Sequence, residues 1–138
     1  TEIYTLSLHD ALPILRIDQI LSYRLPAAGI MSILHRVSGA SLFLMFPFVV
    51  YLFDLSLSSE QGYKEVLALL SHPIFFFIYV GIVWAFSHHF FAGIRHLVCD
   101  LHFGLSKESA SKWGLVVNVS AILLTIILTI LSFKTLYF

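Results

Sequence analysis

Apolar residues gather in three long stretches that are separated by short polar segments. They run over about 30–57, 73–101 and 113–133. At a rise of ~1.5 Å per residue, each stretch is long enough to cross a hydrocarbon core of ~30 Å as a helix. Strands of a membrane barrel would be about ten residues long and would alternate apolar with polar positions. The pattern therefore predicts an all-α membrane protein with three transmembrane helices.

The segments outside these stretches are short. The connectors, residues 54–71 and 102–112, are polar and leave no room for a second soluble domain. We expect residues 16–138 to form one membrane domain. Residues 1–15 stand apart, because they lack the basic start and apolar core of a signal peptide. We expect them to be an artefact of sequencing or expression; the alternative is an interfacial or disordered extension.

Composition narrows the function classes. Charged residues make up 12% of the chain, about half of what a soluble domain carries. A formal net charge of zero argues against nucleic-acid binding, which calls for a basic patch. The single cysteine, Cys99, excludes a disulfide framework and an iron–sulfur cluster ligated by this chain alone. The unusual count is histidine, with seven residues in an apolar chain.

The basic residues predict the orientation of the chain. Loops on the cytoplasmic side of a membrane carry an excess of Lys and Arg. With three helices, the N-terminus and the second connector lie on the same side, and most basic residues belong to these two regions. They are Arg16, Arg24, Arg36, Arg95, Lys107 and Lys112, against Lys64 and Lys134 on the opposite side. We therefore expect a cytoplasmic N-terminus.

Polar residues inside the first two stretches fall on helical stripes. Ser32, Arg36 and Gly39 share one face of the first helix, beside His35. The stripe on the second helix has the spacing i, i+4, i+7 and i+11, with Arg95 beside it. Its members are His89, Gly93, His96 and Asp100. Titratable groups in a membrane span are costly and usually face the bundle or a cavity.

The two helices are antiparallel, so the start of the first is level with the end of the second. We expect Ser32, His35 and Arg36 to meet Arg95, His96 and Asp100 on the cytoplasmic side. His89 would lie deeper, roughly 10 Å from His96 along the helix. The stripes thus predict a polar chamber near the interface, with one imidazole reaching inward.

A buried imidazole beside small residues suits a haem. The iron needs an axial nitrogen, the macrocycle needs space and the propionates need basic partners. His89 would be the ligand of the metal, and Gly93 with Ala92 would leave the space. His35, Arg36 and Arg95 are candidates for the propionates. A second axial imidazole would come from a partner chain or from the first helix, because the third helix has none.

Simpler interpretations exist for single residues. Small residues in a membrane helix are more often packing surface than cofactor contacts. Arg95, Lys107 and Lys112 could be plain cytoplasmic anchors. His72 and His88 are expected to be interfacial or packing residues. His96 and Asp100 could orient Arg95, dock a partner subunit or pack at the helix end. A purely structural account of the whole polar set is strained.

Two segments resemble a known family. Ser32-Ile-Leu-His35-Arg36-Val-Ser-Gly39 and His89-Phe-Phe-Ala-Gly93-Ile-Arg95-His96-Leu-Val-Cys-Asp100 resemble the large membrane-anchor, or cytochrome b556, subunit of succinate:quinone oxidoreductase. The two patterns are specific together and weak apart. The resemblance runs from about Asp18 to the C-terminus, and Arg24-Leu-Pro26 resembles the bacterial branch. Residues 1–15 depart from the family.

The resemblance implies a fold and a set of partners. Three transmembrane helices would pack with a second small anchor subunit into a bundle in the bacterial inner membrane. An iron–sulfur subunit and a flavoprotein that oxidises succinate in the tricarboxylic acid cycle would complete respiratory complex II. The chain would be a non-catalytic subunit of this oxidoreductase.

The resemblance also implies residue roles. His89 matches the axial ligand of haem b, which the partner anchor shares. His35 and Arg36 match residues near the propionates and the quinone pocket, and Ser32 and Arg36 match the ubiquinone contacts. These residue types suit the chemistry, because a Ser hydroxyl can donate to a quinone carbonyl. An Arg supplies a positive charge that does not titrate where the semiquinone anion develops.

Alternatives remain open at this point. A fumarate reductase anchor that uses menaquinone would run the reaction in the other direction. A small transporter or channel with a histidine relay would bind no chromophore. A bare scaffold would lose no activity on replacement of His89 or Arg36. An optical spectrum and the quinone specificity would separate these alternatives.

Overall fold

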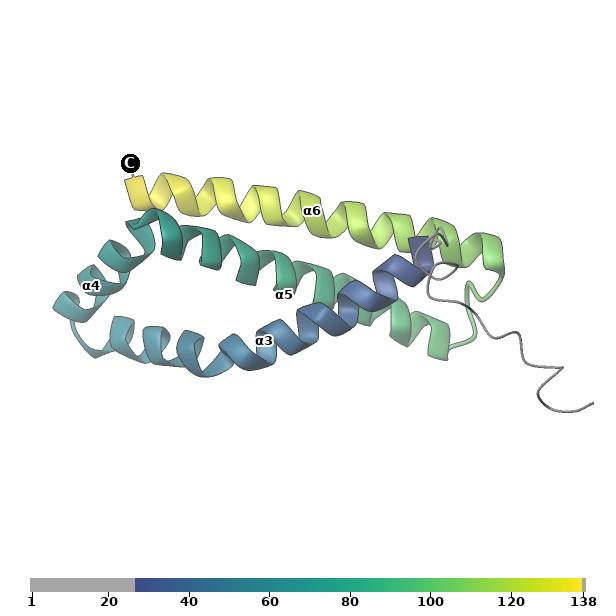
Figure 1. Cartoon of the computed structure of the whole chain (residues 1–138), viewed down its shortest axis with the longest axis horizontal. Coiled ribbons are helices and arrows are strands. Elements are labelled where there is room, and N and C mark those ends of the chain that lie inside the picture. Colours follow the sequence, from purple (N-terminus) through teal and green to yellow (C-terminus); the bar gives the residue numbers. More distant parts are fainter. Residues whose placement is uncertain (1–26, 138) are drawn as a thin grey trace, which may run out of the picture.

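The computed structural model describes residues 27–137 as four helices, with no strand among them (Figure 1). The expectations for residues 1–15, for Arg16 and for Arg24 lie outside the described residues. The long helices are α3 (Ala27–Ser58), α5 (Pro73–Asp100) and α6 (Lys107–Tyr137), and the short helix α4 (Glu60–Ser71) joins α3 to α5. The predicted all-α fold is confirmed.

Three of the helices are long and apolar enough to cross a membrane. These spans are Ala27–Ser58, Pro73–Asp100 and Glu108–Tyr137, and each overlaps one of the three predicted stretches. Large apolar side chains, among them Phe43 and Phe77, are exposed on the isolated chain. Such a surface is stable only against lipid or other apolar protein. The chain is a membrane protein.

The long helices run side by side and alternate in direction (Figure 1). The start of α3, the end of α5 and the start of α6 lie together at one end of the molecule, and α4 lies at the other. A small core of Met31, Ala92 and Val117, with Phe91 packed against it, joins α3, α5 and α6. The fold therefore agrees with the prediction that the polar stripes of the first two long helices lie at the same depth in the membrane.

The first connector differs from the expected plain polar segment, because most of it is helix α4. Ser59 caps this helix: its Oγ accepts a hydrogen bond from the backbone N–H of Gly62 at 2.9 Å. Glu60 in the first turn suits the positive end of the helix dipole. Val66 is buried, whereas Lys64 is exposed and pairs with Glu60. The helix is thus amphipathic and lies against the ends of α3 and α5.

The third long helix is also longer than predicted, at Lys107–Tyr137 against 113–133. Its added first turns are polar, and a pair between Lys112 Nζ and Glu108 Oε1 at 2.7 Å spans one turn. Pairs spaced i, i+4 stabilise a helix only slightly. The run of apolar residues predicted the membrane-spanning part of the helix correctly. It did not predict the polar turns by which the same helix extends toward water.

Candidate functional site

Three imidazoles meet where α3 faces α5. The ring of His35 on α3 stacks on that of His89 on α5, with centroids 4.2 Å apart and planes 14° from parallel. It also lies 4.9 Å from the ring of His96, one to two turns nearer the end of α5. The expectation that His35 meets His96 is confirmed. His35 in fact bridges the two α5 histidines, so His89 is not isolated below the chamber.

The His89 imidazole is held in one orientation by the backbone of α3. Its Nδ1–H donates to the carbonyl oxygen of His35 at 3.2 Å. The hydroxyl of Ser38, which donates to the same carbonyl, lies 3.5 Å from Nδ1. This assignment leaves Nε2 of His89 with a free lone pair, and none of the described residues bonds to it. Metal-binding histidines are commonly fixed through the other ring nitrogen in this way.

Two glycines border the rings, and they differ in how much space they leave. A Cβ on Gly39 would come within 2.9 Å of Cε1 of His89. A Cβ on Gly93 would lie 3.9 Å from Nε2 of His35, an ordinary contact. Gly39 is therefore required for the present position of His89, whereas a Cβ at residue 93 would make only an ordinary contact with His35.

Sequence reasoning did not identify Ser38 and did not give Gly39 its role. Both residues follow His35 by about one helical turn, so they face the same neighbour. Ser38 is fully buried. A search of the turn after His35 for small or hydroxyl residues would have found this contact with His89.

The predicted quinone residues lie on α3 near the cluster. Ser32 is half-buried and Arg36 is exposed, one turn apart on the helix. Asp100 is exposed at the last position of α5. Within residues 27–137, neither Arg36 nor Asp100 has a described ion-pair partner. These groups surround the end of the molecule where α3 begins and α5 ends.

Arg95 is the candidate that the structure does not bring to the histidines. Its side chain lines a separate pocket between α5 and α6, together with Phe91 and Val98 of α5 and Trp113 and Val116 of α6. The sequence placed Arg95 beside the stripe of His89, and the structure turns it to the neighbouring face of α5. The expected place of Arg95 next to a haem propionate gains no support from this arrangement.

His88 and Asn118 form a buried polar pair in the α5–α6 interface. Nε2–H of His88 donates to the side-chain oxygen of Asn118 at 3.0 Å, and His88 is 1% exposed. Its ring tilts against Trp84 at 5.7 Å between centroids. The expectation that His88 is a packing residue agrees with this burial. The partner was missed, because Asn118 was treated as part of a featureless apolar helix.

The cluster suits a haem better than a bare metal ion. Among the described residues, no group of three or more His, Cys, Asp or Glu side chains is arranged to hold a metal ion. A haem needs only one axial nitrogen from this chain, and Nε2 of His89 is available. The buried Nε2 of His35 has no hydrogen-bond partner within the described residues, and Gly93 beside it adds no side chain to this surface.

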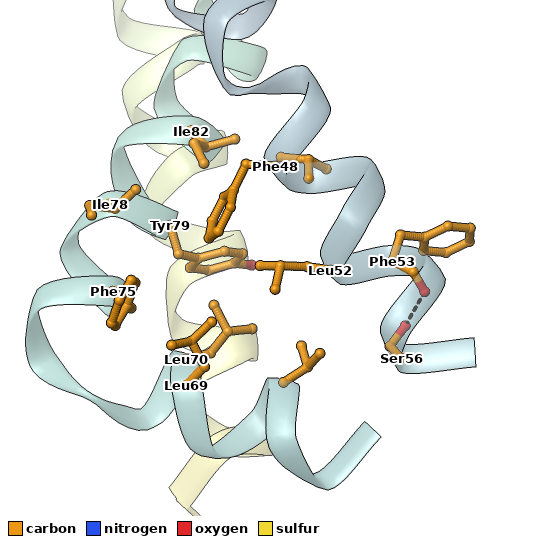
Figure 2. Close-up of a pocket in the computed structure, with 12 residues that line it drawn as sticks. Phe48, Leu52, Phe53, Ser56, Leu69, Leu70, Phe75, Ile78, Tyr79 and Ile82 are labelled. Atoms are coloured by element: carbon orange, nitrogen blue, oxygen red, sulfur yellow. Dashed lines mark hydrogen bonds between the residues drawn. The ribbon is translucent and has the colours of Figure 1, made fainter. Parts of the chain in front are cut away.

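The apolar pocket at the opposite end of the molecule has a different character (Figure 2). It has a volume of about 290 Å³ between α3, α4 and α5. Its polar groups are already engaged: Ser56 Oγ donates to the carbonyl of Phe53, and the hydroxyl of Tyr79 lies 2.6 Å from that of Ser132. Among its described lining residues, no side chain offers a free polar group that would orient a ligand.

Comparison with known proteins assigns the family. The family model described as succinate dehydrogenase/fumarate reductase transmembrane subunit matches residues 17–128, which include both polar stripes. The chain belongs to this family. A transmembrane subunit of such an enzyme acts together with other subunits, so the chain is one part of a larger membrane complex.

Curated relatives agree with the family. The succinate dehydrogenase cytochrome b556 subunit of Paracoccus denitrificans is 29% identical over 80% of this chain and 85% of its own length. The subunit of the same name from Rickettsia prowazekii is 32% identical over 77% and 82%. That from Coxiella burnetii is 38% identical over 59% and 66%. The predicted resemblance to this type of anchor is confirmed.

Proposed function

We propose that the chain is the large membrane anchor of a succinate:ubiquinone oxidoreductase. In this role it holds haem b together with a second anchor and forms part of the ubiquinone site. The observation that carries the proposal is the geometry of His89, whose Nδ1–H is bonded to the His35 carbonyl at 3.2 Å. The family membership and the cytochrome b556 relatives support it.

The residues around His89 would hold the haem. His89 would supply an axial nitrogen through Nε2, and the His35 carbonyl and Ser38 would keep the imidazole in that orientation. His35 and Arg36 would face the propionates, and Gly93 would lie beside the macrocycle. When bound, the haem supplies a one-electron carrier. Arg95 has no part in this proposal, because it faces α6.

Ser32 and Arg36 would bind the quinone head group. They lie one turn apart on α3, so they can act on one ligand. The Ser32 hydroxyl would donate to a quinone carbonyl oxygen. The Arg36 guanidinium would stabilise the negative charge that develops there on reduction, and it would stay protonated throughout. The remaining contacts would come from other subunits.

The rest of the proposal concerns the surroundings of the chain. A second small anchor would supply the other axial ligand, and an iron–sulfur subunit and a flavoprotein would deliver electrons from succinate. The complex would lie in the bacterial inner membrane with the N-terminus of this chain in the cytoplasm. Basic residues are in excess in the N-terminal region and in the connector between α5 and α6, and this excess supports the proposed orientation.

An optical spectrum of the purified complex, taken before and after dithionite reduction, tests the haem. We expect a reduced b-type band that is lost in His89→Ala. The matched control is His72→Ala, because His72 is exposed at the start of α5, far from the cluster. A full band in His89→Ala would contradict the proposal, and no band in the unaltered complex would favour a transporter or a bare scaffold.

Enzyme assays of the same complex test the quinone site. Ser32→Ala and Arg36→Ala should lower ubiquinone reduction about tenfold or more, and dye-linked succinate oxidation should stay near its normal rate. Ser41→Ala is the control, because Ser41 Oγ donates only to the Val37 carbonyl of its own helix. Equal loss of both activities would argue against the assignment. A preference for menaquinone would instead favour the fumarate reductase alternative.

A further inference from the structure

Arg95 has a charge that the rest of the described chain does not neutralise. Its Nε is buried and has no hydrogen-bond partner within residues 27–137, and none of the ion pairs described there includes it. A cation next to a membrane interior is costly unless it is paired. This unmet requirement indicates that a group outside the described residues pairs with Arg95.

The pocket that Arg95 lines is almost entirely apolar apart from Arg95 and Ser120. It has a volume of about 190 Å³ between α5 and α6. Arg95 and Trp113 lie near the ends of their helices, at the depth where aromatic side chains mark the membrane interface. Phe91 lies one turn deeper on α5, and Val116 and Val117 continue the wall on α6. The wall between Arg95 and the membrane centre is thus mostly apolar, and it reaches Ser120 on α6.

We infer that this pocket binds an anionic phospholipid, with the phosphate on Arg95 and an acyl chain along the apolar wall. Basic pockets between transmembrane helices are a known kind of site for anionic head groups. A guanidinium suits a phosphate, because it can donate two parallel hydrogen bonds. A carboxylate from a partner subunit would also neutralise Arg95, but it would not account for the apolar wall that continues below it.

The experiment uses the complex as it is purified in detergent. The complex is delipidated and incubated with phosphatidylglycerol, and the lipid retained per chain is measured by mass spectrometry. Phosphatidylcholine and inorganic phosphate serve as comparison probes. We expect retention of phosphatidylglycerol, little of phosphatidylcholine and none of free phosphate, because the site needs both the charge and the chain.

Substitutions identify the site. Arg95→Gln should lower retention of phosphatidylglycerol about fivefold or more, the effect of one basic residue near an anionic lipid. Lys112→Gln is the matched control: Lys112 lies at the same end of the molecule, but it is exposed and pairs with Glu108. Equal loss in both variants would indicate a general surface charge and overturn the inference.

A second variant keeps the test decisive if Arg95→Gln does not fold. Val116→Trp keeps Arg95 and fills the apolar wall, so it should also lower retention of the lipid. Unchanged retention in the variant that folds overturns the inference. This includes the case in which Arg95→Gln loses a partner subunit but keeps the lipid, which would assign Arg95 to a carboxylate of that subunit.

Discussion

Gly39 determines where the His89 imidazole can lie. A Cβ at this position would approach Cε1 of His89 to 2.9 Å and Nδ1 to 3.2 Å. Helix backbone cannot give way easily at such a contact, so the ring would have to move. The hydrogen bond from Nδ1 to the His35 carbonyl fixes the ring from the same side. The position of the proposed axial ligand therefore depends on a residue that binds nothing itself.

We predict that Gly39→Ala displaces the His89 ring and lowers the haem content. The loss should be roughly tenfold, the low end for changes to groups that orient a metal-bound histidine. The measurement is the reduced b-type absorbance per chain.

Gly81→Ala is the matched control for this prediction. Gly81 lies in α5, and a Cβ there would meet nothing within 4 Å. This variant should keep the full spectrum and gain roughly 0.5–1 kcal/mol from the better helix propensity of alanine. Normal haem content in Gly39→Ala would contradict the prediction, because it would show that the His89 ring can move aside without loss of haem.

Helix α5 presents different chemistry to each of its two long neighbours. Helix α5 turns His89 and His96 to α3, and His88 and Arg95 to α6. The sequence predicted the first face, because three polar residues and a glycine are spaced along one stripe of the helix. It could not separate Arg95 from that stripe, since the rotation of a helix between two neighbours depends on how both of them pack.

The sequence pattern predicted the three long helices but missed two smaller features, helix α4 and the partner of His88. The three spans were predictable because only a long apolar helix suits the bilayer interior. Helix α4 was missed, because its apolar face consists of a few residues in a polar segment. Asn118 was missed because a single amide in an apolar helix gains meaning only when its partner, His88, is placed opposite.

We predict that Asn118→Ala destabilises the packing of α5 on α6. His88 would remain fully buried with its Nε2–H unsatisfied, at a cost of about 1 kcal/mol. The melting temperature of the detergent-solubilised complex should fall measurably. The b-type band should persist, because His89 is held by α3.

Thr129→Val is the control on the same helix. The hydroxyl of Thr129 is buried and has no hydrogen-bond partner among the described residues. Replacing it with a methyl group should leave the melting temperature unchanged or raise it. An equal drop for both variants would mean that shape, rather than the bond between His88 and Asn118, stabilises the interface.

At the scale of the whole molecule, the candidate functional groups are concentrated at one end. The histidine cluster and the Arg95 pocket both lie near the start of α3 and the end of α5, and α4 covers the opposite end (Figure 1). In the proposed function, the quinone site lies on the side of the membrane where the iron–sulfur subunit delivers electrons. The proposed orientation would put this end toward the cytoplasm and α4 toward the other side of the membrane.

We predict that single cysteines will report this topology in a Cys99→Ala background. A cysteine at Glu65, exposed on α4, should react with a membrane-impermeant maleimide added to intact cells. A cysteine at Glu108, exposed at the start of α6, should react only after the membrane is permeabilised. The reverse labelling pattern would indicate the opposite orientation in the membrane and contradict a cytoplasmic N-terminus.

The contact between Gly114 and the start of α3 has a consequence for the distant rings. A Cβ at Gly114 would lie 2.8–2.9 Å from backbone atoms of Ala27 and Ala28, so the two helices touch there main chain to main chain. This close contact constrains the angle at which α3 packs against α6. Any larger residue at 114 would force the start of α3 away from α6, and α3 carries His35 two turns further on. The position of the imidazole cluster thus depends partly on α6, a helix that contributes none of its rings.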